Sequence, residues 1–519
     1  QRQRCKRDRP FVVWLNNFYS RTLAGFLRRR WIALPLVALM IGLIGWLWGS
    51  IPAEMAPLED RSQITINTRG SEGATYEYLR DYTEGINRLV DSLVPEARAV
   101  TARVSSGRGN VQIALKDIAT RERTQMEIAE EVSAAVRTRT KARAFVQQQS
   151  TFGGRRGSMP VQYVLQATNI ERLQEVLPEF MRKVYESPVF QMADVDLKFS
   201  KPEARIAINR DKANLLGVST RNIAQTLQYG LSGQRLGYFY MNGKQYEILA
   251  EINRQQRNKP ADLKSIYVRS DKGEMIQLDN LITLEENVAP PQLYHYNRFL
   301  SATVSAGLAK GKTIGQGLDE MDRIAEQTLG DDFRTALAGD SKEFRESSSS
   351  LIFAFLLAIV LIYLILAAQF ESFKDPLVIM LTVPLAIAGA LVFMAANGQT
   401  MNIFSQIGII MLIGLVAKNG ILIVEFANQK QDAGLNKREA IEQASLQRLR
   451  PILMTSASTI LGLLPLTMAS GEGAQGRIAM GVAVVGGMVV STLLTLYIVP
   501  AIYSYVSTDR IRKTKKNAK

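Results

Sequence analysis

The chain has 519 residues, of which 47% are hydrophobic, and a formal net charge of +15 at pH 7. This length exceeds one domain, and the apolar residues are unevenly placed, because 32–50 and most of 351–506 are apolar whereas 58–348 have the mixed composition of a soluble protein. Much of the positive charge flanks the apolar segments, which indicates a membrane protein and argues against nucleic acid as the partner.

The N-terminal segment 1–30 is basic and is predicted to be a cytoplasmic amphipathic segment. It contains Cys5, the only cysteine of the chain, so no disulfide framework is expected. It has neither an initiating Met nor the composition of a cleavable signal peptide. We therefore expect the chain to be part of a longer protein.

Six segments are long and apolar enough to cross a hydrocarbon core of about 30 Å: 31–50, 350–369, 376–396, 403–427, 451–469 and 478–505. Six crossings return the chain to its starting side. The basic N-terminal segment, the loop 430–450 and the tail 507–519 then share one side, which the positive-inside rule makes cytoplasmic. The region 51–349 is predicted to lie outside. Buried helices of a large soluble protein are the alternative, which the consistent charge asymmetry disfavours.

The outer region is predicted to form two α+β modules. The first, 58–158, has strand 62–68, helix 75–93, strands 98–104 and 110–116, and helix 121–137, a β-α-β-β-α run typical of ferredoxin-like modules. The second, 159–203 and 294–345, has strand 161–167, helix 170–186, strand 192–199 and strand 299–306.

An insertion at 204–293 separates the two parts of the second module. Asn242-Gly243 lies between predicted strands 236–241 and 244–252 and favours a type I′ hairpin turn. Ser270-Asp271-Lys272-Gly273 suggests another hairpin. The predicted fold class is therefore an α-helical membrane domain with six transmembrane helices, five of them in 350–506, plus an outer α+β domain with an inserted module.

Lys418 is the one charge placed deep in an apolar segment, about ten residues, or 15 Å, from the cytoplasmic helix end. Its insertion costs about 3 kcal/mol, so a functional role is expected. The alternative, a snorkelling lysine, suits helix ends. Glu425 shares nearly the same face but lies about 10 Å away along the axis. A carboxylate partner is therefore expected on a helix that this chain does not contain.

Thr455 lies a few residues inside the next span and could share the depth of Lys418 to within a couple of turns. The alternative is a hydroxyl bonded to a carbonyl of its own helix. Six glycines are expected to permit close helix contacts: Gly408, Gly414, Gly420, Gly481, Gly486 and Gly487.

Two motifs carry a family resemblance, GLVAKNGILIVEFA at 414–427 and RLRPILMTS at 448–456. They resemble the C-terminal membrane half of resistance-nodulation-division (RND) efflux permeases, in the branch that exports hydrophobic and amphiphilic drugs. The resemblance extends along the chain through PLEDRSQ at 57–63, AGLAKGKTIGQ at 306–316, FESFKDP at 370–376 and GGMVVSTLLTLYIVP at 486–500.

The resemblance implies a permease half equivalent to spans seven to twelve, in the inner membrane of a Gram-negative bacterium, with periplasmic porter modules and an inserted docking module. It places the family's proton-relay residues on Lys418, Asn419, Arg448 and Thr455, and their acidic partners in the N-terminal half. It also implies a homotrimer of the complete permease, a periplasmic adaptor protein and an outer-membrane channel. The implied activity is export of small amphipathic compounds driven by the proton-motive force, with no cofactor.

One departure concerns Ser105-Ser106-Gly107-Arg108-Gly109-Asn110, where drug-exporting relatives carry a Phe- and Gly-rich switch loop. An aromatic drug trap is not expected here. The segment either gates a substrate or forms a plain hairpin turn.

Other functions are weaker alternatives. AGLAKGKT at 306–313 approximates the context of a phosphate-binding P-loop, but Ala306 replaces the first Gly and the predicted topology places the segment away from cytoplasmic ATP. A P-loop ATPase or ATP-driven transporter is thus disfavoured. His295 is the only histidine, which argues against a catalytic triad or a His-rich metal cluster. A metal-exporting or lipid-exporting RND relative, and a membrane-anchored fragment without transport activity, are the remaining alternatives.

Overall fold

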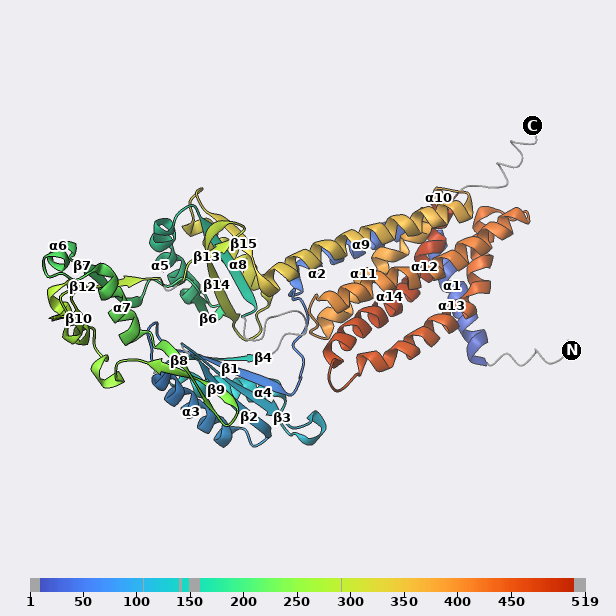
Figure 1. The fold of residues 1–519 in the computed structure, drawn as a ribbon. Helices are drawn as coiled ribbons and strands as arrows, with labels where there is room; N and C mark the ends of the chain where they lie inside the picture. Colours follow the sequence, from blue (N-terminus) through green and yellow to red (C-terminus); the bar gives the residue numbers. More distant parts are fainter. Residues whose placement is uncertain (1–9, 106, 140–141, 149–158, 291, 508–519) are drawn as a thin grey trace. The chain divides into compact units, whose positions relative to one another are not determined.

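A computed structural model describes residues 10–105, 107–139, 142–148, 159–290 and 292–507 (Figure 1). Cys5, Ser106 and the basic tail from 508 lie outside the described residues. The chain divides into two compact units. One comprises Gln1–Gly70, Thr75–Asp196 and Tyr294–Lys519, and the other comprises Ser71–Ala74 and Leu197–Leu293.

Among the described residues, six helical segments are long and apolar enough to cross a membrane. They lie where the sequence predicts spans: α2 (Ala33–Ser50), preceded by the 3-10 turn Arg30–Ile32; α9 (Gly339–Phe370); α10 (Lys374–Met380) with α11 (Thr382–Ala396); α12 (Ile403–Asp432); α13 (Lys437–Thr467); and α14 (Ala474–Val506).

The predicted loop 430–450 is largely helical, which is a correction. Helix α12 continues to Asp432 and α13 begins at Lys437. The extension of α13 buries Ala440, Ile441 and Ala444, which recur at helical spacing on one face. Hydropathy identifies only the apolar part of a helix. The predicted span therefore starts at 451, whereas the helix starts at Lys437.

Helix α14 packs against α11, α12 and α13, and glycines allow the close approach. A Cβ on Gly487 would lie 2.2 Å from Leu412 Cδ2, and one on Gly486 would lie 2.3 Å from Phe393 Cβ. The contact prediction is confirmed for these two and for three further glycines. Within this chain it is wrong for Gly414, where an added Cβ would meet no described atom within 4 Å. The further three are Gly408, Gly420 and Gly481.

Helix α1 (Pro10–Arg28) packs beside α13 and α14. One side of it is buried at Tyr19, Leu23 and Leu27. The Tyr19 hydroxyl donates a hydrogen bond to the Leu496 carbonyl at 2.6 Å. The described part of the N-terminal segment is thus an amphipathic helix that is fixed to the membrane helices.

The first α+β module contains an antiparallel sheet in the order β2-β3-β1-β4. Alternate residues of the strands, such as Ile64 and Ile66, pack with both helices in one core. The strand β4 was not predicted; it is only partly buried. The elements are β1 (Gln63–Arg69), α3 (Tyr76–Leu93), β2 (Ala97–Ser105), β3 (Arg108–Leu115), the 3-10 turn Ile118–Thr120, α4 (Gln125–Arg137) and β4 (Arg143–Gln148).

The second module has a sheet in the order β13-β14-β5-β15, with β6 also paired to β14. Its helices α5 and α8 pack against each other. Helix α9 follows the last strand, and the Ser341 hydroxyl accepts a hydrogen bond from the Gln162 amide at 2.8 Å. The elements are β5 (Val161–Ala167), α5 (Ile170–Glu186), β6 (Phe190–Val195), β13 (Tyr294–Tyr296), β14 (Phe299–Leu308), α8 (Ile314–Thr328) and β15 (Arg334–Leu337).

The second unit contains three antiparallel strand pairs, β7 with β12, β8 with β9, and β10 with β11. Asn242 and Gly243 have φ angles of 51° and 73°, as a type I′ turn requires, so the first predicted hairpin is confirmed. The pairing of β10 with β11 confirms the second. The elements are β7 (Lys201–Ile208), α6 (Arg210–Leu215), α7 (Thr220–Leu231), β8 (Gln234–Met241), β9 (Lys244–Ala250), the 3-10 turns Arg254–Gln256, Pro260–Ser265 and Leu278–Asn280, β10 (Tyr267–Arg269), β11 (Met275–Gln277) and β12 (Ile282–Ala289).

Candidate functional site

Lys418 lies within α12, where the preceding Val416 and Ala417 are buried. Its own side chain is exposed on the surface of the chain and has no hydrogen bond or ion pair with any residue that the structure describes. Glu425 accepts a hydrogen bond from Gln429 Nε2 at 3.1 Å and lies about two turns from Lys418. An ammonium group in an apolar helix therefore faces outward from this chain without a carboxylate.

Asn419 points the other way, into a buried polar triad. Its Nδ2 donates to Ser456 Oγ at 3.2 Å and to Thr492 Oγ1 at 3.5 Å, and Thr492 Oγ1 donates to Ser456 Oγ at 3.2 Å. The three side chains come from α12, α13 and α14. Because Ser456 follows Thr455 and Asn419 follows Lys418, this contact places Lys418 and Thr455 at the same depth in the bundle.

Thr455 and Arg448 lie on α13. The half-buried Thr455 hydroxyl donates to the Ile452 carbonyl at 3.1 Å, which is the own-helix bond expected as the alternative to a relay role. Arg448 lies two turns, about 10 Å, from Thr455 toward the N-terminal end of α13. Its guanidinium carbon is 4.3 Å from the centroid of the Phe426 ring, and its buried Nε has no hydrogen-bond partner among the described residues. The structure thus brings Lys418 and Thr455 to one level and Arg448 to another.

Asp375, at the start of α10, is a buried carboxylate with 2% of its surface exposed, and no sequence pattern predicts its burial. It accepts hydrogen bonds from Asn428 Nδ2 at 3.1 Å and from Ser507 Oγ at 2.8 Å. The Tyr503 hydroxyl donates to Asn428 Oδ1 at 2.6 Å. Asn428 is ten residues, about 15 Å, from Lys418 along α12, so Asp375 is not within reach of the lysine. This cluster fixes the ends of α10, α12 and α14 together.

The proposed gating segment 105–110 is a tight hairpin between β2 and β3 in its described residues. Gly107 has a φ of 77°, which favours glycine. Gly109 lies against the hydrogen-bonded Thr68 and Thr83, and a Cβ there would come within 2.3 Å of Thr68 Oγ1. Ser105 and Arg108 pair across the turn, and Asn110 Nδ2 donates to Asn67 Oδ1 at 2.9 Å. These contacts describe a hairpin that is fixed to its sheet.

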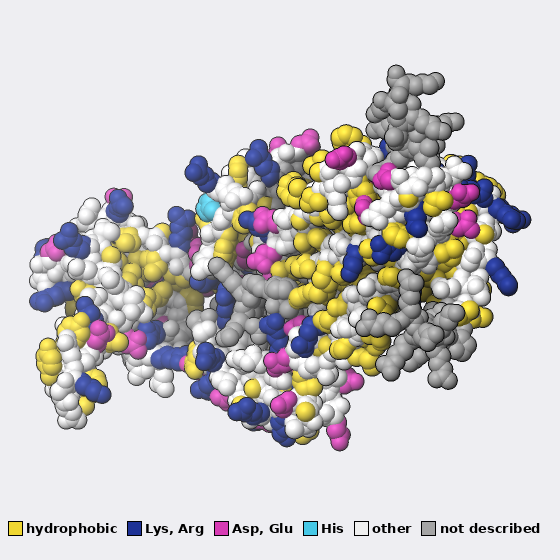
Figure 2. Space-filling model, turned by 90° about the vertical axis from the view of Figure 1, so that its right-hand side faces the viewer, with side chains coloured by type: hydrophobic (Ala, Val, Ile, Leu, Met, Phe, Trp, Pro, Cys, Tyr) yellow, Lys and Arg dark blue, Asp and Glu magenta, His cyan; other side chains and the backbone are white. Residues whose placement is uncertain are grey.

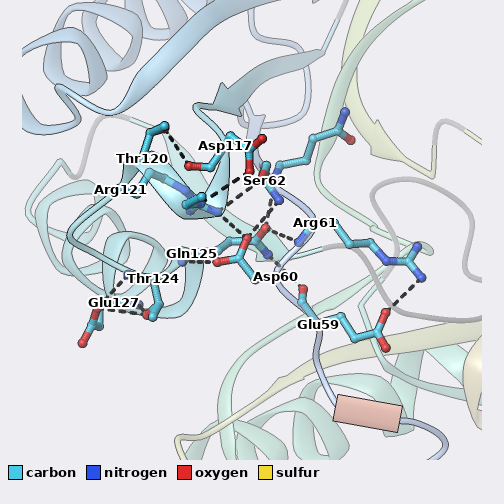
Figure 3. Close-up of polar contacts among 12 residues, drawn as sticks. Glu59, Asp60, Arg61, Ser62, Asp117, Thr120, Arg121, Thr124, Gln125 and Glu127 are labelled. Carbon is cyan, nitrogen blue, oxygen red and sulfur yellow. Dashed lines mark hydrogen bonds and ion pairs between the residues drawn. The ribbon is translucent and has the colours of Figure 1, made fainter. Parts of the chain in front are cut away.

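The motif PLEDRSQ positions the connection from α2 to the first module (Figure 3). Asp60 accepts hydrogen bonds from Arg121 Nη2 at 2.7 Å, the Gln125 amide at 2.9 Å and the Ser62 amide at 3.1 Å. Partial burial by itself would raise the pKa of Asp60, but these hydrogen bonds and the charge of Arg121 outweigh it and lower the pKa. The motif is therefore explained as a structural junction.

The same connection contacts the turn between α11 and α12. Ala53 forms a parallel bridge with Met401, and the Glu54 amide donates to the Met401 carbonyl at 3.0 Å. The Thr400 hydroxyl donates to the Glu54 carboxyl group. Burial raises the pKa of Glu54, and the bond from Thr400 only partly opposes this effect.

The segment AGLAKGKT connects β14 to α8, with Gly311 at a φ of 76°. Lys310 Nζ lies 2.8 Å from Glu130 Oε1, whereas Lys312 is exposed. His295 is exposed on β13. Within the described ranges, no group of three or more His, Cys, Asp or Glu residues could hold a metal ion.

Similarity to known proteins extends over nearly the whole chain. Residues 1–507 match the model of the AcrB/AcrD/AcrF family. The chain is 29% identical over 508 residues to an uncharacterized transporter of Haemophilus influenzae, and the alignment covers 95% of this chain and 49% of that protein. The chain therefore spans about half the length of this curated relative.

Proposed function

This chain belongs to the AcrB/AcrD/AcrF family of RND-type membrane transporters, and we propose that it is the C-terminal half of a permease that exports small amphipathic compounds in exchange for protons. The observation that carries the proposal is Lys418, a cation in an apolar helix that forms no ion pair with any carboxylate of the described residues. An intramembrane charge of this kind marks an ion pathway when a partner is available. We place this partner acid on the N-terminal half of the permease, outside these 519 residues.

The triad of Asn419, Ser456 and Thr492 supports a switching role for the lysine. It holds α12 against α13 and α14 on the buried side, while Lys418 and Thr455 stay at one depth outside it. Protonation of the partner acid releases Lys418 and shifts the packing of the two halves between two states. Each proton that moves inward supplies about 2.3 kcal/mol per 100 mV of membrane potential.

The complete pump is proposed to be a homotrimer in the inner membrane of a Gram-negative bacterium. Its α+β modules lie in the periplasm, where they take up substrate and contact an adaptor protein that leads to an outer-membrane channel. Support for this orientation comes from basic residues at one end of the membrane helices, such as Arg28, Arg438 and Arg450.

The test is Lys418→Ala in the complete pump, with Lys430→Ala as the matched control on the same helix. Lys430 already has a neighbour, since its Nζ lies 5.5 Å from the Phe426 ring centroid. Drug efflux from cells should be lost in Lys418→Ala and kept in Lys430→Ala at equal membrane amounts. Normal efflux by Lys418→Ala would show that Lys418 is not part of the proton relay.

Two further variants compare the contributions of Arg448 and Thr455 to efflux. Arg448→Ala should weaken efflux because it removes a half-buried cation whose Nε has no partner in the described part of the chain. Thr455→Ala should weaken it less, because the hydroxyl already bonds to Ile452. A larger defect in Thr455→Ala than in Arg448→Ala would contradict this order.

A further inference from the structure

A groove of about 260 Å³ lies between the amphipathic helix α1 and α13, and among its lining residues only Arg450 is charged. The lining is otherwise apolar except for one amide side chain. The groove is lined by Leu15, Asn16, Leu449, Arg450, Leu453 and Met454. An apolar groove with one cation among its lining residues has the composition of a site for a lipid with a charged head group.

Arg450 is available for a ligand. Its side chain is exposed, and it makes no hydrogen bond or ion pair with the described residues. At 3.6 residues per turn, Arg450 and Met454 point about 100–160° away from Arg448 and Thr455. The groove is therefore on a different face of α13 from the one proposed to meet the missing half.

Helix α1 adds the second observation. Trp14 and Phe18 are 59% and 51% exposed, and their rings stack with centroids 5.6 Å apart. Tyr19 and Leu23 on the other side are buried against the membrane helices. An amphipathic helix with exposed aromatic rings lies at the level of the lipid head groups. Arg450, immediately before the apolar part of α13, is at this level too.

We propose that the groove binds one anionic phospholipid of the cytoplasmic leaflet. The lipid phosphate contacts Arg450 and Asn16, and an acyl chain lies along Leu449, Leu453 and Met454. The proposal rests on the membrane orientation given above and is independent of the transport activity, because lipid binding is measured without a proton gradient. A lipid bound here contacts both α1 and α13. Helix α1 leads into α2, and α13 contains Arg448 and Thr455.

The experiment uses the purified 519-residue chain, stripped of lipid in a neutral detergent and titrated with cardiolipin, phosphatidylglycerol or phosphatidylcholine. Native mass spectrometry counts the bound lipids. One cardiolipin or phosphatidylglycerol should bind more tightly than phosphatidylcholine. Arg450→Gln should weaken that binding about fivefold, and Arg450→Lys should restore most of it. Arg438→Gln, an exposed arginine on the same helix, should leave it unchanged.

A groove-filling variant, Met454→Trp, separates the site from general charge attraction. It keeps all charges and changes a side chain that is 66% exposed, so the fold should persist in a thermal unfolding assay. It should lower binding of the tight lipid. Equal losses in Arg450→Gln and Arg438→Gln, or equal affinity for phosphatidylcholine, would overturn the proposal. So would displacement of the lipid by a polypeptide that supplies the missing half, or tight binding only after residues 1–9 are removed.

Discussion

Gly487→Ala tests the packing of α14 most directly. An added Cβ would lie 2.2 Å from Leu412 Cδ2 and 2.9 Å from the Ala386 carbonyl oxygen. The leucine side chain can turn away, but the backbone oxygen of α11 cannot move without the helix. The helices must therefore separate, and overpacking of this kind costs about 1–3 kcal/mol.

Gly414→Ala is the matched control on α12, because a Cβ there would meet no described atom within 4 Å. Both variants replace a helical glycine by alanine, which favours the helix by up to about 1 kcal/mol in each case. The difference between them therefore isolates the packing term, about 1–3 kcal/mol in favour of Gly414→Ala.

The assay is thermal unfolding of the 519-residue chain in detergent, followed by tryptophan fluorescence. The control belongs in this chain alone, because Gly414 is exposed here and could be covered in a complete permease. A lower midpoint is expected for Gly487→Ala than for Gly414→Ala, by about 1–3 °C for a chain of this length. Equal midpoints, or a lower one for Gly414→Ala, would refute the packing account.

Four further predictions concern the outer region. Asp60→Asn should lower the free energy of unfolding by about 1–2 kcal/mol near pH 7. The difference should vanish as pH falls below 3.8, because the contacts that lower the pKa of Asp60 favour only its ionised form. Glu54→Gln should instead raise the free energy of unfolding, and this gain should appear as pH rises above 4.5, because burial disfavours the ionised carboxylate of Glu54. Unfolding midpoints measured across pH check both variants. Lys312→Ala should leave efflux normal, and magnesium-dependent ATP binding that this variant loses would revive the P-loop alternative. Asn242→Cys should react with an impermeant reagent once the outer membrane is opened; protection until the inner membrane is lysed would reverse the orientation.

The regular elements could be predicted wherever one face is apolar. The periodicity of residues 170–186 gives α5 with its observed bounds, and Asn242-Gly243 gives a hairpin with both φ angles positive. Strand β4 could not be found, because RAFVQQ buries its side chains only partly and does not alternate clearly. The start of α13 was missed because its first turns are polar and pack against neighbours through small residues such as Ala440 and Ala444.

Only the part of the candidate site that stands out in the sequence could be predicted. Lys418 is conspicuous in sequence because a charge interrupts an apolar run. Ser456 and Thr492 are not, since neutral polar residues are common in membrane helices and only the fold shows that they meet Asn419. Asp375 lies at the border of a span, and its burial depends on Asn428 and Ser507, which are distant in the sequence.

We propose that Lys418 needs an acid from outside this chain, and one transport measurement tests this requirement. The 519-residue chain is placed in vesicles with a pH gradient, alone or with a second polypeptide that supplies six spans and a mid-membrane acid pair. We expect substrate export only with the second polypeptide, and loss of export when its acids are replaced by Asn. Proton-driven export by the 519-residue chain alone would contradict it.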